Sequence, residues 1–489
     1  MSYIIYFFIL IISSIHAQPP SLTSQSLCVQ YYPNNDQSSQ CECDDIDINR
    51  LSLKCLGHSY VPHFLPHIHY DRIDLESCAQ DLQIGDKTFA DLNINTLALR
   101  HCNLLSLSEE SFAKINHLEK FSIENSTIVS LSTSTGNFQE VFQSDSFRTL
   151  KSLILKNVHY HQTHKHDKKL NLEKLLTQLP QLNRLELTNI YLDNYRYENL
   201  TNIGRNLTYL KLINTHQTSL VPIEHLPSLE RLILIHLPQI FHTQPLIASI
   251  KFLKKLKYIF FAQNQLKNLD DLQSKTIDQI DLSSNLIESI DEYTFEHIPK
   301  LRTLTLTKNP LRSIDKNAFC GIDNLTLLYI NNEHSSQISP LDNCLLLSHA
   351  QLDIKQDSQT KLQCNCPLMH VFRLKRKHSR DINNLFKPNH ACVVTNTTLE
   401  QAKNPYQLQH HLNLPIYIYE LENYLNCSYT DDSCDRHCQD RRVKSTTISP
   451  IKVHKTSIDV QSKNTSVSPS LYSFFSYTLC LLLFAIRYL

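Results

Sequence analysis

Residue clusters able to carry out chemistry are few in this chain of 489 residues. The sequence has no G-x-S-x-G, H-E-x-x-H, P-loop or G-x-G-x-x-G motif, which removes the common hydrolase, zinc-protease and nucleotide-binding sites. Lys and Arg together number 47, as do Asp and Glu, so no excess charge favours nucleic acid. We therefore expect neither an enzyme nor a resident cofactor.

A histidine cluster is the first candidate for chemistry. It consists of His159, His161, His164 and His166. Imidazoles at such spacing can bind Zn²⁺ or Cu²⁺. The alternative is an exposed polar insertion, which we favour because 25 histidines are scattered through the chain. We therefore predict no metal site here.

A local basic cluster is the second candidate. It consists of Arg373, Lys375, Arg376, Lys377 and Arg380. Such a cluster can contact a glycosaminoglycan or anionic lipid headgroups. The simpler interpretation is the solvated face of a helix, and the anionic ligand stays an open alternative.

The elements that must position any functional side chain repeat along the sequence. Residues 280–298 recur 24 positions later as residues 304–322, on the template L-x-L-x-x-N. Periods of this size with this pattern are typical of leucine-rich repeats. A degenerate twelfth unit is expected at Leu352. The first apolar position of the eleven clear units falls at Ile73, Leu97, Phe121, Leu153, Leu185, Leu210, Leu232, Ile259, Ile280, Leu304 and Leu328.

Stacking explains why a chain repeats such a unit. Each unit supplies a short strand whose alternate residues, such as Ile280 and Leu282, point inward, and no unit can bury that face alone. The expected fold is an α/β solenoid, a curved horseshoe with a parallel sheet on its concave face and an irregular, 3-10 or helical convex side. With only five glycines, turns of positive φ must rely on asparagine.

The template asparagine is expected to turn inward and satisfy backbone groups of the neighbouring unit. Asn264, Asn285 and Asn309 can do this. In the middle of the chain the same position holds Val158, Ile190 and Leu237, which cannot.

Strand alternation also predicts which side chains face outward on the concave sheet. The first repeats present mainly charges there, including Arg72, Asp74, Glu76, Arg100, Lys120 and Glu124. The later repeats present Tyr209, Ile213, Ile233, Ile235, Tyr258 and Phe260. Three adjacent repeats exposing such residues predict a ligand-binding patch. The alternative is that these residues merely favour strands, or that a glycan or loop covers them.

Cysteine-rich segments flank the repeats. C-x12-CECDDIDINRLSLKC followed by VPHFLP precedes them, and CNCPLMHVFRLKRK with later cysteines follows. In these motifs the sequence resembles the extracellular leucine-rich-repeat family with cysteine caps, the group of Slit, Toll ectodomains, chaoptin and connectin. The resemblance covers roughly residues 28–430. The pairings that it implies are Cys28–Cys43, Cys41–Cys55, Cys364–Cys392 and Cys366–Cys427.

Two further cysteine pairs are each separated by 24 residues, one repeat. Equivalent positions in adjacent units lie roughly 5 Å apart, which a disulfide can bridge. We predict that Cys320 pairs with Cys344. Cys78 and Cys102 form either a disulfide or two buried thiols. The partners of Cys434 and Cys438 are left open.

Both termini are apolar, which suggests the secretory pathway. Residues 1–17 read as a signal peptide, and seven Asn-x-Ser/Thr sequons agree with secretion. Residues 471–489 form a hydrophobic tail after a Ser/Thr-rich stretch, typical of a glycosylphosphatidylinositol (GPI) signal, with a short transmembrane helix as the alternative. The sequons are Asn125, Asn199, Asn206, Asn324, Asn396, Asn426 and Asn464.

The expected domain order runs from residues 1–17 (signal peptide) through 18–70 (N-terminal cap), 71–355 (about eleven repeats) and 356–438 (C-terminal cap) to 439–470 (disordered stalk) and 471–489 (tail). Within the family, chaoptin and connectin are most similar to this layout. We expect a recognition or adhesion protein on the extracellular side of the plasma membrane, binding a protein ligand through its concave face. The alternatives are a pattern-recognition co-receptor without a signalling domain and a secreted matrix component. The oligomeric state is left open.

Overall fold

The computed structural model describes most of the repeats and parts of the cysteine-rich segments on either side of them. Its described residues are 41–47, 50–78, 81–160, 170–192, 204–215, 225–237, 246–269, 272–315, 317–322, 324–329, 353–355, 362–364, 366, 369 and 391–427. All of them belong to one compact unit, Met1–Gln439.

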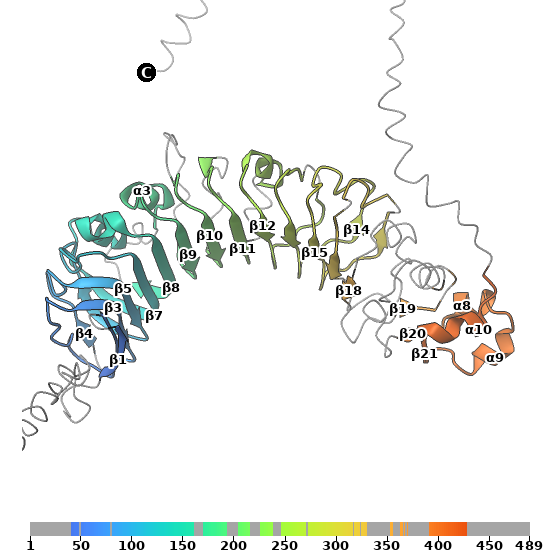
Figure 1. The fold of residues 1–489 in the computed structure, drawn as a ribbon, viewed down its shortest axis with the longest axis horizontal. Coiled ribbons are helices and arrows are strands. Elements are labelled where there is room, and N and C mark those ends of the chain that lie inside the picture. Colours follow the sequence, from blue (N-terminus) through green and yellow to red (C-terminus); the bar gives the residue numbers. More distant parts are fainter. Residues whose placement is uncertain are drawn as a thin grey trace, which may run out of the picture. The chain divides into compact units, whose positions relative to one another are not determined.

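One sheet of sixteen strands runs through the repeats, with its strands side by side (Figure 1). Its path follows chain order, and every pairing along it is parallel except the antiparallel pair β1–β2 at its start. The strands on the path are β1 (Cys41–Asp47), β2 (Arg50–Leu56), β3 (His69–Glu76), β5 (Asn93–Arg100), β7 (Lys120–Leu131), β8 (Ser152–Tyr160), β9 (Arg184–Thr188), β10 (Tyr209–Ile213), β11 (Arg231–Ile235), β12 (Tyr258–Phe260), β13 (Gln279–Asp281), β15 (Thr303–Thr305), β17 (Leu327–Tyr329) and β18 (Asp353–Lys355).

The register of this sheet follows the repeat. The first apolar residue of each unit from Ile73 to Leu328 pairs with that of the next unit. The prediction for the twelfth unit was wrong by two residues, because Leu328 pairs with Ile354 rather than Leu352. At the other end Leu53 pairs with Ile73, so the N-terminal cysteine segment adds β1 and β2 to the same sheet.

The core is continuous along the repeats. Ile280 is 1% exposed and Leu282 is fully buried, as the alternation requires. Three phenylalanines of successive units, Phe64, Phe89 and Phe112, stack with ring centroids 6.2 and 5.9 Å apart. Each unit thus buries its apolar residues against the next, which gives a parallel-sheet solenoid of stacked coils.

The template asparagines are buried and bridge neighbouring units. The Oδ1 of Asn285 accepts from the backbone N–H of Asn264 (3.0 Å) and Leu266 (3.1 Å), while its Nδ2 donates to the carbonyl of Phe261 (2.7 Å). Asn264 and Asn309 make the same kind of bonds. The prediction for the C-terminal half is confirmed.

The middle units use asparagine one position earlier. Asn125 and Asn157 lie within β7 and β8, whereas Asn189 and Asn214 directly follow β9 and β10, and all four have positive φ (49–53°). Their amides form a row, in which Asn157 donates to Asn125, Asn189 to Asn157, and Asn214 to Asn189. We call this row the asparagine ladder. It joins four adjacent units where Val158 and Ile190 fill the inward position.

Residues other than asparagine share the left-handed conformation at this position, contrary to the expectation from composition. His101 (φ 53°) and His236 (φ 57°) adopt it, and their N–H groups donate to the carbonyls of Glu124 (3.0 Å) and Ala262 (3.3 Å) in the next unit. Sheet hydrogen bonding therefore outweighs the local cost of positive φ, which is about 1–2 kcal/mol for such residues.

Short helices and strands complete the units away from the main sheet. Figure 1 shows α3 on the far side of its unit from β9, and its buried leucines face the core. These elements are β4 (Asp81–Gln83), β6 (Asn103–Leu107), η1 (Phe138–Gln143), η2 (Asp145–Thr149), α3 (Leu172–Gln178), α5 (Leu246–Ser249), η4 (Ile250–Phe252), β14 (Ser289–Ile290) and β16 (Ser313–Ile314).

The C-terminal cysteine segment has a small core of its own, built on Cys364, Met369, Cys392 and surrounding apolar residues. A three-stranded sheet supports it, in the order β19–β20–β21. Its elements are β19 (Leu362–Gln363), β20 (Ala391–Val393), α8 (Asn396–Glu400), α9 (Pro405–Gln409), β21 (Pro415–Tyr417), η6 (Ile418–Glu420) and α10 (Leu421–Tyr424).

Four disulfides lie among the described residues, namely Cys41–Cys55, Cys78–Cys102, Cys364–Cys392 and Cys366–Cys427. Cys78 and Cys102, for which buried thiols were the alternative, are therefore bonded. Cys43 and Cys320 are also disulfide-bonded. Their expected partners, Cys28 and Cys344, lie outside the described residues, as do Cys434 and Cys438.

Candidate binding surface

The open face of the sheet carries the side chains that alternate with the buried template residues. Its N-terminal half, on β3 to β9, is a row of ion pairs. Asp74 Oδ2 accepts from Arg72 Nε (2.7 Å) and Arg100 Nη1 (3.0 Å), and Glu124 bonds both Arg100 (3.4 Å) and Lys156 (3.1 Å). Each of these charged groups thus has an opposite charge beside it.

A buried carboxylate ends the row of ion pairs. Glu186 on β9 is 3% exposed. Its oxygens accept from Arg184 Nε (2.9 Å) and lie 3.5 Å from Lys211 Nζ and 3.9 Å from Lys156 Nζ. A buried carboxylate needs such partners, because an unpaired charge would cost several kcal/mol.

The apolar patch begins on the next strand. Its six members, all partly exposed, come from β10, β11 and β12, and they are Tyr209, Ile213, Ile233, Ile235, Tyr258 and Phe260. The intervening residues Leu210, Leu232 and Ile259 are buried. The parallel register sets Ile213 beside Ile235 and Ile233 beside Phe260. The structure thus gathers all six predicted residues on one face, while their role in ligand binding stays a prediction.

Arginine and tyrosine alternate along one edge of this patch. Register places Arg184, Tyr209, Arg231 and Tyr258 side by side at the first position of four adjacent strands. The Arg184 guanidinium lies 4.0 Å from the centre of the Tyr209 ring, and that of Arg231 lies 6.0 Å from the Tyr258 ring. Both distances are within the range of cation–π attraction, which orients the guanidinium groups.

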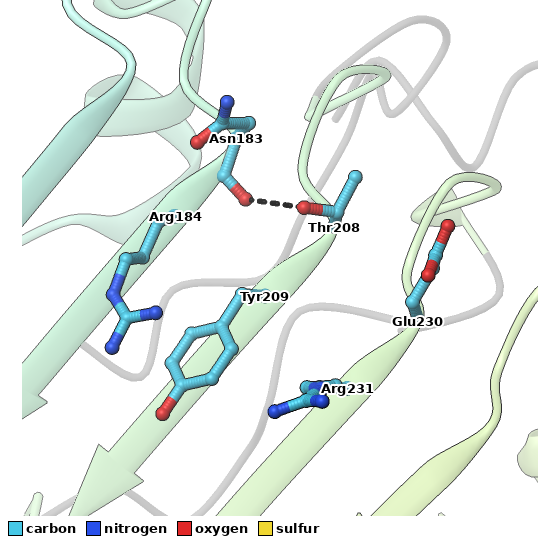
Figure 2. A pocket seen from close by; sticks show the side chains of 6 residues that line it. All are labelled: Asn183, Arg184, Thr208, Tyr209, Glu230 and Arg231. Carbon is cyan, nitrogen blue, oxygen red and sulfur yellow. Dashed lines mark hydrogen bonds between the residues drawn. The ribbon is translucent and has the colours of Figure 1, made fainter. Parts of the chain in front are cut away.

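A hollow of about 340 Å³ opens at the start of these strands (Figure 2). In Figure 2 the Tyr209 ring lies between Arg184 and Arg231. The hydroxyl of Thr208 donates to the carbonyl of Asn183 (3.1 Å), and this hydrogen bond joins two residues that line the hollow. Glu230 completes the lining, and its carboxylate bonds Lys257 (3.0 Å).

Both tyrosine hydroxyls stay protonated at neutral pH. Burial raises the pKa of Tyr209, and the Glu186 carboxylate raises it further, against the opposing effect of Arg184 and Arg231. Burial likewise raises the pKa of Tyr258. Each phenol can therefore donate a hydrogen bond to an acceptor at this edge.

A second, smaller hollow lies at the equivalent edge of the N-terminal units. It measures about 260 Å³ and is lined by Arg50, His69, Asn95, His117 and Glu119. Arg50 is paired with Asp71, and Glu119 with Lys151. We find no unpaired cation in its lining that would attract a ligand.

Potential metal ligands come together once among the described residues, in a group formed by Cys41, Cys55 and His58. The two sulfurs are joined in a disulfide, so they offer no thiolate to a metal ion. Of the histidine cluster, His159 is exposed on β8, and His161, His164 and His166 lie outside the described residues. The basic cluster from Arg373 to Arg380 also lies outside them.

Five of the seven sequons are described, and their asparagines are all exposed, namely Asn125, Asn206, Asn324, Asn396 and Asn426. Asn206 and Asn324 occupy the same place in their units, where each Nδ2 donates to a proline carbonyl of the preceding unit. Both precede their strands, so a glycan on either would begin beside the sheet rather than on its open face, whereas Asn125 lies within β7. Asn199 and Asn464 lie outside the described residues.

Sequence reasoning missed Arg184, Glu186 and Arg231. The signal was present, because each residue flanks a template leucine in "RLELT" or "RLILI" and alternation sends it to the open face. The sequence does not show which of these charges pair across neighbouring strands.

Comparisons with known proteins identify the repeated unit. A family model described as leucine rich repeat matches residues 275–334, and one described as BspA type leucine rich repeat region matches residues 72–163. The chain is 30% identical over 114 residues to Leucine-rich repeat-containing protein 3 of Danio rerio, a match that spans 23% of this chain and 41% of that protein. The fold search finds an internalin from Listeria monocytogenes at 16% identity and a TM-score of 0.36, covering 63% of this chain and 86% of that one.

None of the described helices is long and apolar enough to cross a membrane. The fold, the register and the two family matches agree on one unit. The stacked coils of this solenoid are leucine-rich repeats.

Proposed function

We propose that this chain is a cell-surface recognition or adhesion protein that binds an extracellular protein ligand through the apolar patch on the open face of its sheet. One observation carries the proposal, namely that three adjacent strands present two tyrosines, a phenylalanine and three isoleucines to solvent. Soluble proteins rarely leave such a patch uncovered without a partner.

The composition of the patch suits a protein partner. Aromatic side chains and arginine are enriched at the centres of protein–protein interfaces, and they carry much of the binding energy. Here the Tyr209 ring lies beside Arg184, the Tyr258 ring beside Arg231, and Phe260 beside Tyr258. The strands are hydrogen-bonded in one sheet, so binding costs little ordering of the backbone.

The extracellular location is part of the proposal and is supported by chemistry. Disulfides persist in oxidising compartments, and the described residues hold four of them. The apolar N-terminus and the exposed sequons agree with passage through the secretory pathway. The hydrophobic tail would hold the protein at the membrane, by a lipid anchor or a short helix.

The test is the triple change Tyr209→Ser, Tyr258→Ser and Phe260→Ser. Partners of the wild-type chain are first found by screening it against the cell-surface proteins of its own organism. We expect the variant to be secreted normally and to lose at least about tenfold in affinity for any partner so found, because each truncated aromatic anchor costs about 1–2 kcal/mol or more.

A matched control changes Gln279, Thr303 and Thr305 to Ser on the neighbouring strands β13 and β15 of the same face. The control should bind as the wild type does. Unchanged binding by the patch variant, at equal secretion and thermal stability, would reject the patch as the binding surface.

A further inference from the structure

Among the described residues, Arg231 has no carboxylate partner, and it lies at the edge of the apolar patch. It is exposed at the start of β11, between Tyr209 and Tyr258. Among the residues that the structure describes, no carboxylate forms an ion pair with its guanidinium and no oxygen accepts a hydrogen bond from it. Its guanidinium lies 6.0 Å from the centre of the Tyr258 ring.

The other described cations around the hollow each have a carboxylate partner. Arg184 and Lys211 both bind Glu186, and Lys257 binds Glu230 at 3.0 Å. Glu230 is the carboxylate adjacent to Arg231 in the chain, and it is engaged elsewhere. Among the described residues that line the hollow, Arg231 is therefore the one cation with no carboxylate partner, and Tyr209 and Tyr258 add hydroxyl donors beside it.

We propose that Arg231 receives the carboxylate of an aspartate or glutamate side chain of the protein ligand, while a neighbouring apolar side chain of the same ligand lies on Ile233 and Phe260. This inference rests on the proposed function and specifies the ligand's chemistry. The guanidinium fork matches a carboxylate with two parallel hydrogen bonds, a geometry that lysine cannot supply.

The observations favour an acidic protein segment over a sulfated glycan. A glycan chain with many anionic groups needs several unpaired cations in a row, and on this face Arg184, Lys211 and Lys156 are already paired. The hollow of about 340 Å³ has room for a side chain. The surface immediately beside it is apolar, which suits a mixed acidic and apolar peptide.

The experiment uses the full-length chain, purified from expressing cells, and a displayed library of random short peptides as the probe. We expect the enriched peptides to carry Asp or Glu within a few residues of Leu, Ile, Phe or Trp. The Arg231→Gln variant should bind them about 10- to 100-fold more weakly, because a hydrogen-bonded charge contributes about 1.5–3 kcal/mol.

Two companion variants keep the test specific. Arg231→Lys keeps the charge without the fork, and we expect an intermediate affinity. Arg302→Gln removes an exposed arginine at the same edge, immediately before β15, and should change the affinity less than about threefold. Secretion and thermal stability of all three variants should equal those of the wild type, because both arginines are exposed.

Three results would overturn the inference. Enriched peptides without an acidic residue would do so, as would unchanged binding by Arg231→Gln. A chain that ignores peptides but binds heparin fragments through Arg231 would show a sulfated-glycan site instead. The proposed function fails separately, when the patch variant with Tyr209, Tyr258 and Phe260 changed to Ser binds the peptides as the wild type does.

Discussion

Arg184 and Arg231 occupy the same position of their units, two strands apart, and yet they have different surroundings. Arg184 is held by Glu186 from its own strand, whereas the equivalent residue on the strand of Arg231 is Ile233. A single exchange of glutamate for isoleucine therefore leaves one guanidinium without a carboxylate. At the scale of residues, the chemistry of the open face depends on such pairings rather than on the repeat itself.

Another residue-scale feature is His58, which is 7% exposed, with Nε2 3.7 Å from Cys41 Sγ. Burial lowers the pKa of this imidazole. The unfolded chain then binds more protons than the folded one once the pH falls below about 6.5. As the pH is lowered below about 6.5, the free energy of unfolding should therefore fall, by at most about 1.4 kcal/mol per pH unit for one group.

The measurement is urea denaturation of His58→Gln and wild type at pH 7.5 and pH 5.5. We expect the variant to lose less stability between these pH values, since neutral glutamine replaces the titrating group. The exposed His63 supplies the control His63→Gln, which should lose as much as the wild type. An equal loss in all three proteins would contradict a role for His58.

At the scale of elements, the sequence predicted the strands well because burial imposes the period. Leucine or a similar residue must recur wherever a strand returns to the core, and Ile280, Leu304 and Leu328 do so at a constant 24 residues. The prediction failed for the twelfth unit, where a weaker pattern offered Leu352 as well as Ile354.

The sequence did not reveal the asparagine ladder or the ion-pair row. Both require knowing which residues of different units lie side by side, and the middle units differ in length. Asn125, Asn157 and Asn189 are 32 residues apart, while Asn214 follows after 25. The apolar patch was predictable because alternation within one strand suffices to place its residues.

The ladder predicts a specific pattern of stability. Asn157, with a φ of 50°, donates to Asn125 and accepts from Asn189. Asn157→Gly should lose only the two hydrogen bonds, about 0.5–1 kcal/mol each at this partly exposed site. Asn157→Ala should lower the free energy of unfolding by about 1–2 kcal/mol more than Asn157→Gly does, because alanine disfavours positive φ. Urea denaturation of both variants measures the difference.

Equal stabilities of the two variants would contradict the argument from backbone conformation. Stabilities equal to wild type in both would contradict the ladder itself. The exposed Lys308, which also has positive φ (58°) but belongs to no ladder, provides a comparison. There alanine should again be less stable than glycine, and glycine should be no less stable than lysine.

At the scale of the whole molecule, the repeats and the C-terminal cysteine segment bury separate cores. The disulfides follow this division, since Cys78–Cys102 joins adjacent units and Cys364–Cys392 lies within the small C-terminal core. The role that we propose for the tail at residues 471–489 is inferred from its amino-acid composition alone. The prediction made from this tail therefore concerns where the protein is located rather than how it folds.

We expect phosphatidylinositol-specific phospholipase C to release the full-length protein from the surface of expressing cells. A GPI anchor would replace the apolar tail, and the enzyme cleaves such anchors. Changing Leu482 and Leu483 to Arg should disrupt the signal and leave no anchored protein at the surface. Retention of the wild type after the enzyme, with extraction by detergent alone, would favour a short transmembrane helix.

The constant spacing of β13, β15 and β17 has a consequence for how this protein can vary between relatives. Each of these strands bonds only to its two neighbours, in an identical register. Loss or gain of one whole unit of 24 residues would leave every remaining junction intact, whereas an insertion of any other length would have to bulge outward as a loop. Orthologues should therefore gain or lose whole units here without a change of register, and insertions of other lengths should fall in the loops between the strands.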